Sequence, residues 1–260
     1  MELFHIPYQD FKAFFLIWTR VGMVLFLFPF FSSRTIPTLS KIGLALLFTI
    51  ILFPVTNLQS APDLTSTGGL VKLIASELLI GVILGLLIQI FFEGVKMMGE
   101  VVGFQIGLSI SNILDPQSGI QVSVLSNMAY LLSIVLFLIF DGHHVLLRGL
   151  KQSFEIIRIG SIHLTEEGFL AIARKCGDLF VLAVKIGAPA IASLLLMKMA
   201  FGFIARVMPQ LNIMIDAFPV QVVVGLLFFG ASLVVLERLM AKYTGGLDIL
   251  LIKAMMYLKG

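Results

Sequence analysis

The sequence predicts an all-α, membrane-type helical protein with long, kinked helical hairpins. Of its 260 residues, 59% are hydrophobic and only 13% are charged, whereas soluble domains have about 45–50% apolar and about 25% charged residues. The mean hydropathy is +1.06. The apolar runs are continuous and do not alternate as the strands of a membrane barrel do. These features exclude a disordered chain, a disulfide-stapled secreted domain and an ordinary soluble enzyme.

Six apolar segments are long enough, or nearly long enough, to cross a bilayer as helices, which takes about 20 residues each. They are 14–31, 40–56, 70–92, 124–140, 179–205 and 218–236. The third continues to about Leu108, and as one helix it would measure roughly 58 Å, nearly twice a hydrocarbon core of about 30 Å. The fifth is also overlong. Such helices must tilt, break or pack against protein, which favours a protein assembly over free lipid.

Polar stretches connect these segments. We expect a turn at 57–69, a long hydrophilic loop at 141–178, a linker at 206–217 and an amphipathic tail after Leu236. The N-terminus lacks the basic region of a cleaved signal peptide, so we expect the mature protein to start near Met1.

Charge and cysteine content narrow the function classes. The chain has 18 basic and 15 acidic residues, a net charge of +3, and no Lys/Arg-rich run, so nucleic acid is not expected as a partner. The single cysteine, Cys176, can form neither an intramolecular disulfide nor a Cys-built metal site. We expect it to be a small packing residue.

Four charged residues lie inside the apolar segments, and we predict them to be buried charges. A charge near the bilayer centre costs at least about 2.5–3.5 kcal/mol. Arg20 and Glu77 lie deep in their segments, so we expect each to have a partner or to face another subunit. For Lys185 and Lys198 the favoured interpretation is the simpler one, that they snorkel from near the helix ends.

Glycines at four-residue spacing indicate close helix packing. Gly81 and Gly85 form one G-x-x-x-G pattern, and Gly99, Gly103 and Gly107 form a double one. On a helix this spacing places glycines on one face, where a neighbouring backbone can approach closely. Chance in a chain with 23 glycines explains the first pair nearly as well, but the triple predicts a tightly packed helix.

Motifs that carry chemistry are absent from the sequence. Asp141, His143 and His144 suggest a metal site, but adjacent residues point apart on a helix and no second ligand cluster stands nearby. A structural turn is the favoured interpretation. There is no Walker loop, H-E-x-x-H, G-x-S-x-G or paired-carboxylate pattern. We therefore predict a protein that is no enzyme and has no cofactor or metal.

The segment 103–127 combines polar and apolar residues between two apolar segments. Asp115 and Pro116 are a turn-starting pair, because proline biases the preceding residue away from helix. Unsatisfied backbone in lipid costs several kcal/mol per group, so this segment must be buried in protein or line a wet cavity. It is a candidate pore element, and an ordinary connection outside the membrane is the alternative.

Three stretches resemble the FliR/SctT family of type III export-gate proteins, over nearly the whole chain. The first comprises Arg20-Val21-Gly22 through Pro29, Ile36-Pro37 and Lys41-Ile42-Gly43 to Pro54. The second comprises Gly103-Phe104-Gln105-Ile106-Gly107 through Asp115-Pro116, then Gly142-His143-His144. The third and most specific comprises Arg206 through Asn212, Phe218-Pro219 and Gly225. The Gly-His-His element is similar to the flagellar branch rather than the injectisome branch.

The resemblance implies a non-enzymatic subunit of the flagellar protein export gate. Members of this family assemble with FliP and FliQ into a tapered ring in the bacterial inner membrane, raised toward the periplasm. FlhB wraps the ring from the cytoplasmic side, the MS ring of the basal body surrounds it, and unfolded flagellar proteins pass through. The resemblance also implies a FliP-like part at 1–178 fused to a FliQ-like helical hairpin and tail at 179–260.

A pore plug is the site that the resemblance implies. A loop of the family subunit closes the pore, and this role falls on 103–122. Its implied plug residues are Phe104, Gln105, Ile106, Ile110, Asn112, Ile113, Asp115 and Pro116. The isoleucines supply the dry seal, and the polar residues keep the loop compatible with a wet lumen.

Residues expected to pack subunits are Gly81, Gly85, Gly99, Gly103, Gly107, Arg206, Pro209, Gln210, Asn212, Phe218 and Pro219.

Two alternatives remain open. A self-contained secondary transporter of small molecules would account for the intramembrane charges and for a broken third segment, but no inverted repeat with matching Gly/Pro interruptions relates the two halves. The other alternative is the injectisome counterpart of the export gate. A transporter should be stable alone or as a small homo-oligomer, whereas a gate subunit should need its partners.

Overall fold

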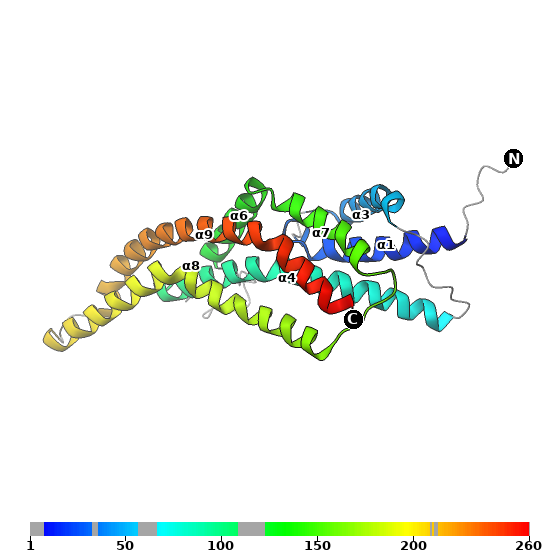
Figure 1. Ribbon diagram of the computed structural model, residues 1–260. Coiled ribbons are helices and arrows are strands. Elements are labelled where there is room, and N and C mark those ends of the chain that lie inside the picture. Colours follow the sequence, from blue (N-terminus) through cyan, green and yellow to red (C-terminus); the bar gives the residue numbers. More distant parts are fainter. Residues whose placement is uncertain are drawn as a thin grey trace. The chain divides into compact units, whose positions relative to one another are not determined.

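The computed structural model describes residues 8–32, 36–56, 67–108, 123–208, 210 and 213–259, and these are almost entirely helical (Figure 1). The elements in chain order are α1 (Tyr8–Leu27), α2 (Pro29–Ser32), α3 (Thr38–Leu52), the short 3₁₀ helix η1 (Phe53–Val55), α4 (Thr67–Ile106), α6 (Val124–Ile139), α7 (Gly142–Ile156), α8 (Glu166–Val207) and α9 (Ile213–Lys259). No strand occurs in the described ranges. The predicted all-α class is confirmed.

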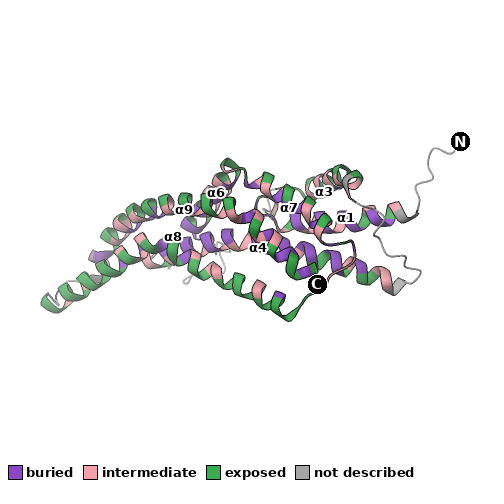
Figure 2. Ribbon diagram, in the orientation of Figure 1, coloured by how far each residue is buried: buried purple, intermediate pink, exposed green. Residues whose placement is uncertain are grey.

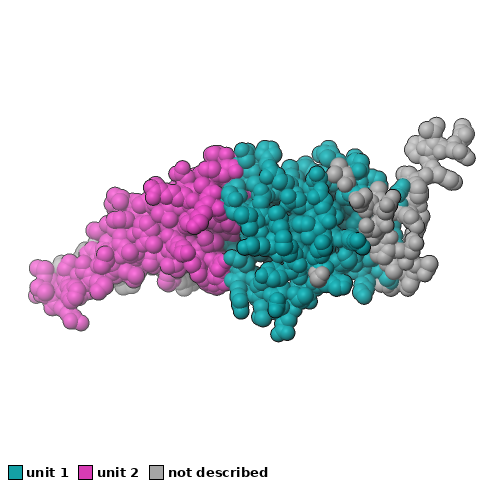
Figure 3. All heavy atoms as spheres, in the orientation of Figure 1, with its two compact units in different colours: residues 1–90, 141–176, 244–260 teal, residues 91–140, 177–243 magenta. Residues whose placement is uncertain are grey.

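The chain divides into two compact units, coloured separately in Figure 3. Unit 1 comprises residues 1–90, 141–176 and 244–260, and unit 2 comprises residues 91–140 and 177–243. Each unit therefore combines segments that are far apart in the sequence. The proposed division into FliP-like and FliQ-like parts at residue 178 stays a prediction.

Three helices are long and apolar enough to cross a membrane, with spans at Gly69–Ile106, Glu166–Val207 and Ala217–Lys259. A fourth would be α6 with α7, if this pair, bent by 71°, is one span. Within the described residues, three or four candidate spans are thus found, fewer than the six apolar segments of the sequence. Helix α3 has 15 residues, about 22 Å, too short for a core of about 30 Å. Helix α1 carries Asp10, Lys12 and Arg20 in its 20 residues.

Several predicted boundaries change. The third apolar segment does not break, because α4 continues for 40 residues. The predicted loop at 141–178 is mostly helix, containing α7 and the first turns of α8. The linker at 206–217 shrinks to five residues between α8 and α9, and the tail after Leu236 is the second half of the 47-residue α9.

Helix α7 shows why the loop prediction was wrong. Its buried residues recur every three or four positions, at Gly142, Leu146, Gly149, Leu150 and Ser153. His144, Arg148, Lys151 and Glu155 are exposed, so the hydrophilic composition belongs to the outer face of an amphipathic helix.

Glycines bring α4 close to α1 inside unit 1. A Cβ added at Gly81 would lie 2.8 Å from Met23 Cβ and 3.1 Å from the Arg20 carbonyl oxygen. A Cβ at Gly85 would lie 2.7 Å from Leu27 Cβ. These distances are shorter than packed carbons tolerate, so only glycine fits. This pair, expected to pack subunits, packs two helices of the same chain.

Gly99 has the corresponding place in unit 2. A Cβ there would lie 2.6 Å from the backbone nitrogen of Ser126, at the start of α6. The Ser126 hydroxyl donates a hydrogen bond of 2.9 Å to the Lys96 carbonyl oxygen on α4. The obstacle at Gly99 is backbone rather than a movable side chain, so a larger residue at this position would push α4 and α6 apart.

Burial differs sharply among the long helices (Figure 2). The most apolar stretch of α4 is 56% buried, whereas those of α8 and α9 are only 28% and 22% buried. Helix α4 is therefore a core helix of this chain. Helices α8 and α9 present mostly uncovered apolar surface. Cys176 is also exposed on α8, so its predicted packing role within the chain is wrong.

The Gly99→Ala variant should destabilise the protein, because its methyl group pushes α4 away from α6. Overpacking of this kind costs about 1–3 kcal/mol. Gly202→Ala is the matched control, since no atom lies within 4 Å of a Cβ at Gly202 and alanine favours helix over glycine by about 1 kcal/mol. Thermal unfolding of both purified variants in detergent checks the prediction. Equal melting temperatures would contradict it.

Candidate functional site

Helix α4 ends inside the predicted plug segment 103–122, so the first plug residues are helical. Gly107 has a φ of 92°. Its N–H donates to the Phe104 carbonyl at 3.1 Å, and the Leu108 N–H donates to the Gly103 carbonyl at 3.1 Å. These two bonds form a Schellman motif, in which a left-handed glycine stops the helix. Gly107 therefore serves as the helix stop, and its predicted role in packing subunits stays a prediction.

The last turn of α4 is anchored by α9 within unit 2. The Gln221 side-chain amide donates a hydrogen bond to the Gln105 carbonyl. Ile106 is fully buried and fills the space that a side chain at Gly225 would occupy. Ile106, expected to seal the pore, is thus enclosed by its own chain and fixes the point from which the plug segment departs.

Phe104 differs from its neighbours because it is 63% exposed. It lines a shallow hollow of about 530 Å³ with Glu100, Gln105 and Lys198. The other predicted plug residues, Ile110, Asn112, Ile113, Asp115 and Pro116, lie outside the described residues. The structure therefore describes only the start of the predicted plug segment and the surface beside it.

Arg20 and Glu77 form a buried ion pair in unit 1. Their closest atoms, Arg20 Nε and Glu77 Oε2, are 2.6 Å apart, and both side chains are 0% exposed. A second bond joins Arg20 Nη2 to Glu77 Oε1 at 3.1 Å, which makes the contact bidentate. Such pairs are the strongest form of charge-assisted hydrogen bond.

Further groups complete the surroundings of this pair. Arg20 Nη1 donates to the Ser153 carbonyl oxygen at 2.8 Å, and the Arg20 guanidinium lies 4.3 Å from the centre of the Phe154 ring. The Gly160 N–H donates to Glu77 Oε1 at 2.7 Å. The pair thereby joins α1, α4, α7 and the turn that follows α7.

Lys185 and Lys198 are exposed in this chain. Both lie well inside the 42-residue α8, which extends from Glu166 to Val207. Neither charge is buried within this chain, so burial against another subunit and snorkelling both stay predictions.

The Asp141–His144 region forms the sharp bend between α6 and α7. Asp141 adopts a left-handed conformation with φ 56° and ψ 24°, and the two helices meet at 71°. His144 Nδ1 lies 3.2 Å from Asp141 Oδ1. The rings of His143 and His144 have centroids 4.1 Å apart, so the expectation that the two side chains point apart is wrong.

This trio is also a possible metal-ligand set, because one ligand atom from each residue lies within 4.8 Å of the others. Three ligands are one fewer than a closed structural zinc site requires, and Asp141 and His144 are exposed. The structural turn that we predicted is therefore the role that the geometry favours.

The remaining predicted packing residues, except Gly103 on α4, lie at or near the α8–α9 connection. Arg206, Gln210, Phe218 and Pro219 are exposed, whereas Pro209 and Asn212 lie outside the described residues. Gly103 is buried. The four exposed packing residues near this connection can therefore contact other chains.

Sequence reasoning missed Gln221 and Ser126. Gln221 lies one helical turn before Gly225, which puts both on the same face of α9. A polar side chain four residues before a glycine in an apolar helix was the available signal. Ser126 carried no such signal, because its partner is a backbone carbonyl on another helix.

These features define a class of protein, an all-α membrane protein whose long helices expose apolar surface. Its polar segment begins where the well-packed helix α4 ends. Residues 11–246 match the family model described as "Bacterial export proteins, family 1". The chain belongs to this family.

Named relatives cover most of the chain. The flagellar biosynthetic protein FliR of Pectobacterium carotovorum subsp. carotovorum is 34% identical over 222 residues, 85% of this chain and 84% of that protein. The FliR of Escherichia coli (strain K12) is 32% identical over 212 residues, covering 82% and 80%. The FliR of Bacillus subtilis (strain 168) is 31% identical over 217 residues, covering 82% and 83%.

Arg20→Met should destabilise the protein strongly, because it leaves the Glu77 carboxylate buried without its counter-ion. Removing one partner of a buried pair costs about 3–5 kcal/mol. Arg148→Met is the control: Arg148 pairs with Asp248 at 3.3 Å while 60% exposed, and surface pairs contribute about 0–1 kcal/mol. Denaturant unfolding in detergent compares the two. A loss for Arg20→Met no larger than for Arg148→Met would contradict the assignment.

Proposed function

We propose that this protein is a structural and gating subunit of the flagellar type III protein export gate. It forms part of the pore through which unfolded flagellar proteins cross the bacterial inner membrane. The observation that carries this proposal is the family match over residues 11–246, together with relatives named flagellar biosynthetic proteins over more than four-fifths of the chain. Those names describe a part of an export apparatus and accord with a role that is not enzymatic.

The uncovered apolar surface supports membership of an assembly. Phe203 on α8 is 64% exposed and Leu227 on α9 is 66% exposed, and they belong to rows of large apolar side chains on both helices. Contiguous surface of this kind must be covered by lipid or by other proteins. We propose that FliP and FliQ cover part of it, with FlhB on the cytoplasmic side.

The same proposal gives the location. The gate lies in the inner membrane at the flagellar basal body, inside the MS ring and raised toward the periplasm. The interior lysines of α8 accord with this placement, since Lys185 and Lys198 would be costly if they faced lipid near the bilayer centre.

The end of α4 at Gly107 supports a plugging role for the residues that follow it. Helix α4 is fixed by α9 up to Ile106, and the chain leaves the helix at Gly107. We propose that the residues beyond it close the pore, with Ile110 and Ile113 as the dry seal. Asn112, Asp115 and Gln117 face the wet lumen. The exposed Phe104 is placed to contact the plug or a neighbouring subunit.

The transporter alternative loses two supports. It drew on a broken third segment, whereas α4 is continuous from Thr67 to Ile106. It also drew on intramembrane charges, of which Arg20 and Glu77 neutralise each other inside the chain. The injectisome alternative has no relative among those named above.

Deleting residues 110–118 should make the assembled gate leak small ions, because the seal is lost while the root of the segment stays anchored. Ion flux across inverted membrane vesicles measures the leak. Replacing the same nine positions by alternating Gly and Ser is the matched control, since it keeps the length and removes the apolar side chains; it should leak as well. A deletion strain that assembles the complex and stays ion-tight would show that the plug lies elsewhere.

Purification tests the assembly. Extracted together with its co-expressed neighbours, the protein should appear in native mass spectrometry as a hetero-oligomer containing several copies of FliP and FliQ. A stable monomer or small homo-oligomer, unaffected by the absence of those neighbours, would favour the transporter instead.

A further inference from the structure

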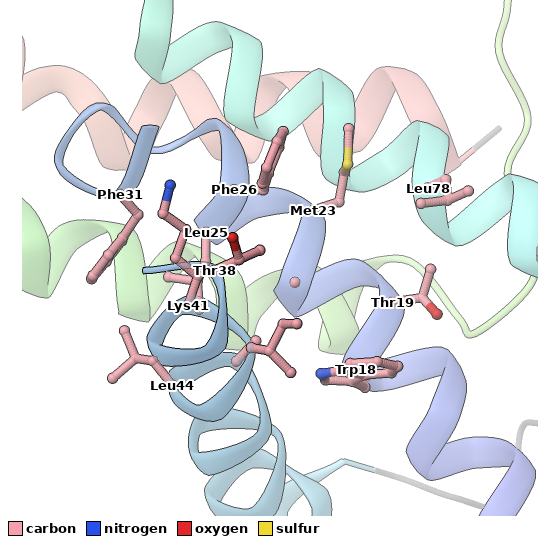
Figure 4. A pocket seen from close by; sticks show the side chains of 13 residues that line it. Trp18, Thr19, Met23, Leu25, Phe26, Phe31, Thr38, Lys41, Leu44 and Leu78 are labelled. Atoms are coloured by element: carbon pink, nitrogen blue, oxygen red, sulfur yellow. The ribbon is translucent and has the colours of Figure 1, made fainter. Parts of the chain in front are cut away.

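Unit 1 contains an apolar pocket between α1, α2, α3 and α4, with a volume of about 270 Å³ (Figure 4). Most of its lining is aliphatic or aromatic, including Phe26 and Phe31. The polar exceptions are Trp18, Thr19, Thr38 and Lys41. An apolar cavity of about 150 Å³ stays dry and accepts benzene, so a pocket of this size favours a hydrocarbon segment over water.

Trp18 is the unusual member of the lining. Its indole nitrogen is shielded from solvent and has no acceptor among the described residues. Figure 4 shows the nitrogen end of the ring directed toward α3, whose Lys41 and Leu44 line the pocket. An indole N–H can only donate, and a buried donor without an acceptor destabilises the folded chain. An occupant that supplies an acceptor removes this cost.

The neighbouring hydroxyl does not supply that acceptor, because Trp18 Nε1 makes no hydrogen bond to it. Thr19 Oγ1 instead donates to the Phe15 carbonyl oxygen at 2.8 Å. A tryptophan with an apolar body and a polar nitrogen is typical of the level where acyl chains meet lipid headgroups. Lys41 adds a positive charge to the same lining.

We propose that this pocket binds one phospholipid. Part of an acyl chain fills the apolar space, an ester carbonyl accepts the hydrogen bond from Trp18 Nε1, and the phosphate lies on the side of Lys41. An apolar side chain of another subunit would fill the space without satisfying Trp18. The proposal requires only that the chain lies in a membrane, so it stands apart from the gating role.

Gly22 provides a way to close the pocket. It belongs to the lining, and a Cβ there would meet no atom within 4 Å, so Gly22→Leu extends into open space without displacing the helix. Gly43 on α3 is the matched control. It likewise has no atom within 4 Å of a Cβ, is exposed, and lies outside the lining.

The full chain is reconstituted in nanodiscs of phosphatidylglycerol in which a small fraction carries brominated acyl chains. Because Trp18 is the single tryptophan of the sequence, its fluorescence reports lipid contact at Trp18 alone, and the Gly22→Leu variant isolates the part that comes from the pocket. Wild type and Gly43→Leu should be quenched alike, and Gly22→Leu should be quenched about two-fold less, since a filled pocket no longer encloses the chain. Equal quenching of wild type and Gly22→Leu, or no quenching in wild type, overturns the proposal.

Two further measurements separate the occupants. Trp18→Phe keeps the ring and removes the donor, so the phospholipid retained through delipidation should be held about tenfold more weakly in native mass spectrometry. Retention equal to wild type overturns the assignment of the carbonyl.

In the co-purified complex, the brominated lipid should still quench Trp18 of this chain when the neighbours' tryptophans are replaced. Loss of quenching there, with quenching kept in the isolated chain, identifies a neighbouring subunit as the occupant and overturns the lipid proposal.

Discussion

The buried pair of Arg20 and Glu77 is the constraint on which unit 1 depends. Its charges lie 57 positions apart in the sequence, yet they meet at 2.6 Å with neither side chain exposed. Desolvating two ions costs several kcal/mol each, and only a complete set of hydrogen bonds offsets that cost. Ser153 and Gly160 supply the remaining bonds. Helices α1, α4 and α7 must therefore be in place together for the pair to be satisfied.

Close packing by glycine complements this electrostatic constraint. Gly81 lies next to Met23 and the Arg20 carbonyl, so the same face of α1 that presents the guanidinium also receives the glycines of α4. A larger residue at Gly81 would separate the helices and lengthen the distance between the charges. The ion pair and the glycine contact are thus two parts of one helix–helix interface.

The sequence alone predicted the fold class because an apolar excess of this size admits few solutions, and continuous apolar runs favour helices. It also singled out Arg20, Glu77 and the glycines as unusual. It did not reveal their partners, since contacts between helices depend on three-dimensional register. Helix α7 was not predicted, because its outer face carries as much charge as a loop. The two roles of the Gly99–Gly107 series could not be separated, because packing and helix stopping both select glycine.

Helices α8 and α9 carry a consequence for how such a protein is made. More than two-thirds of their most apolar stretches lack cover inside the chain. A copy without its partner subunits leaves this surface to lipid alone. Under the proposed function, the scarcest subunit therefore limits how many complete gates can form.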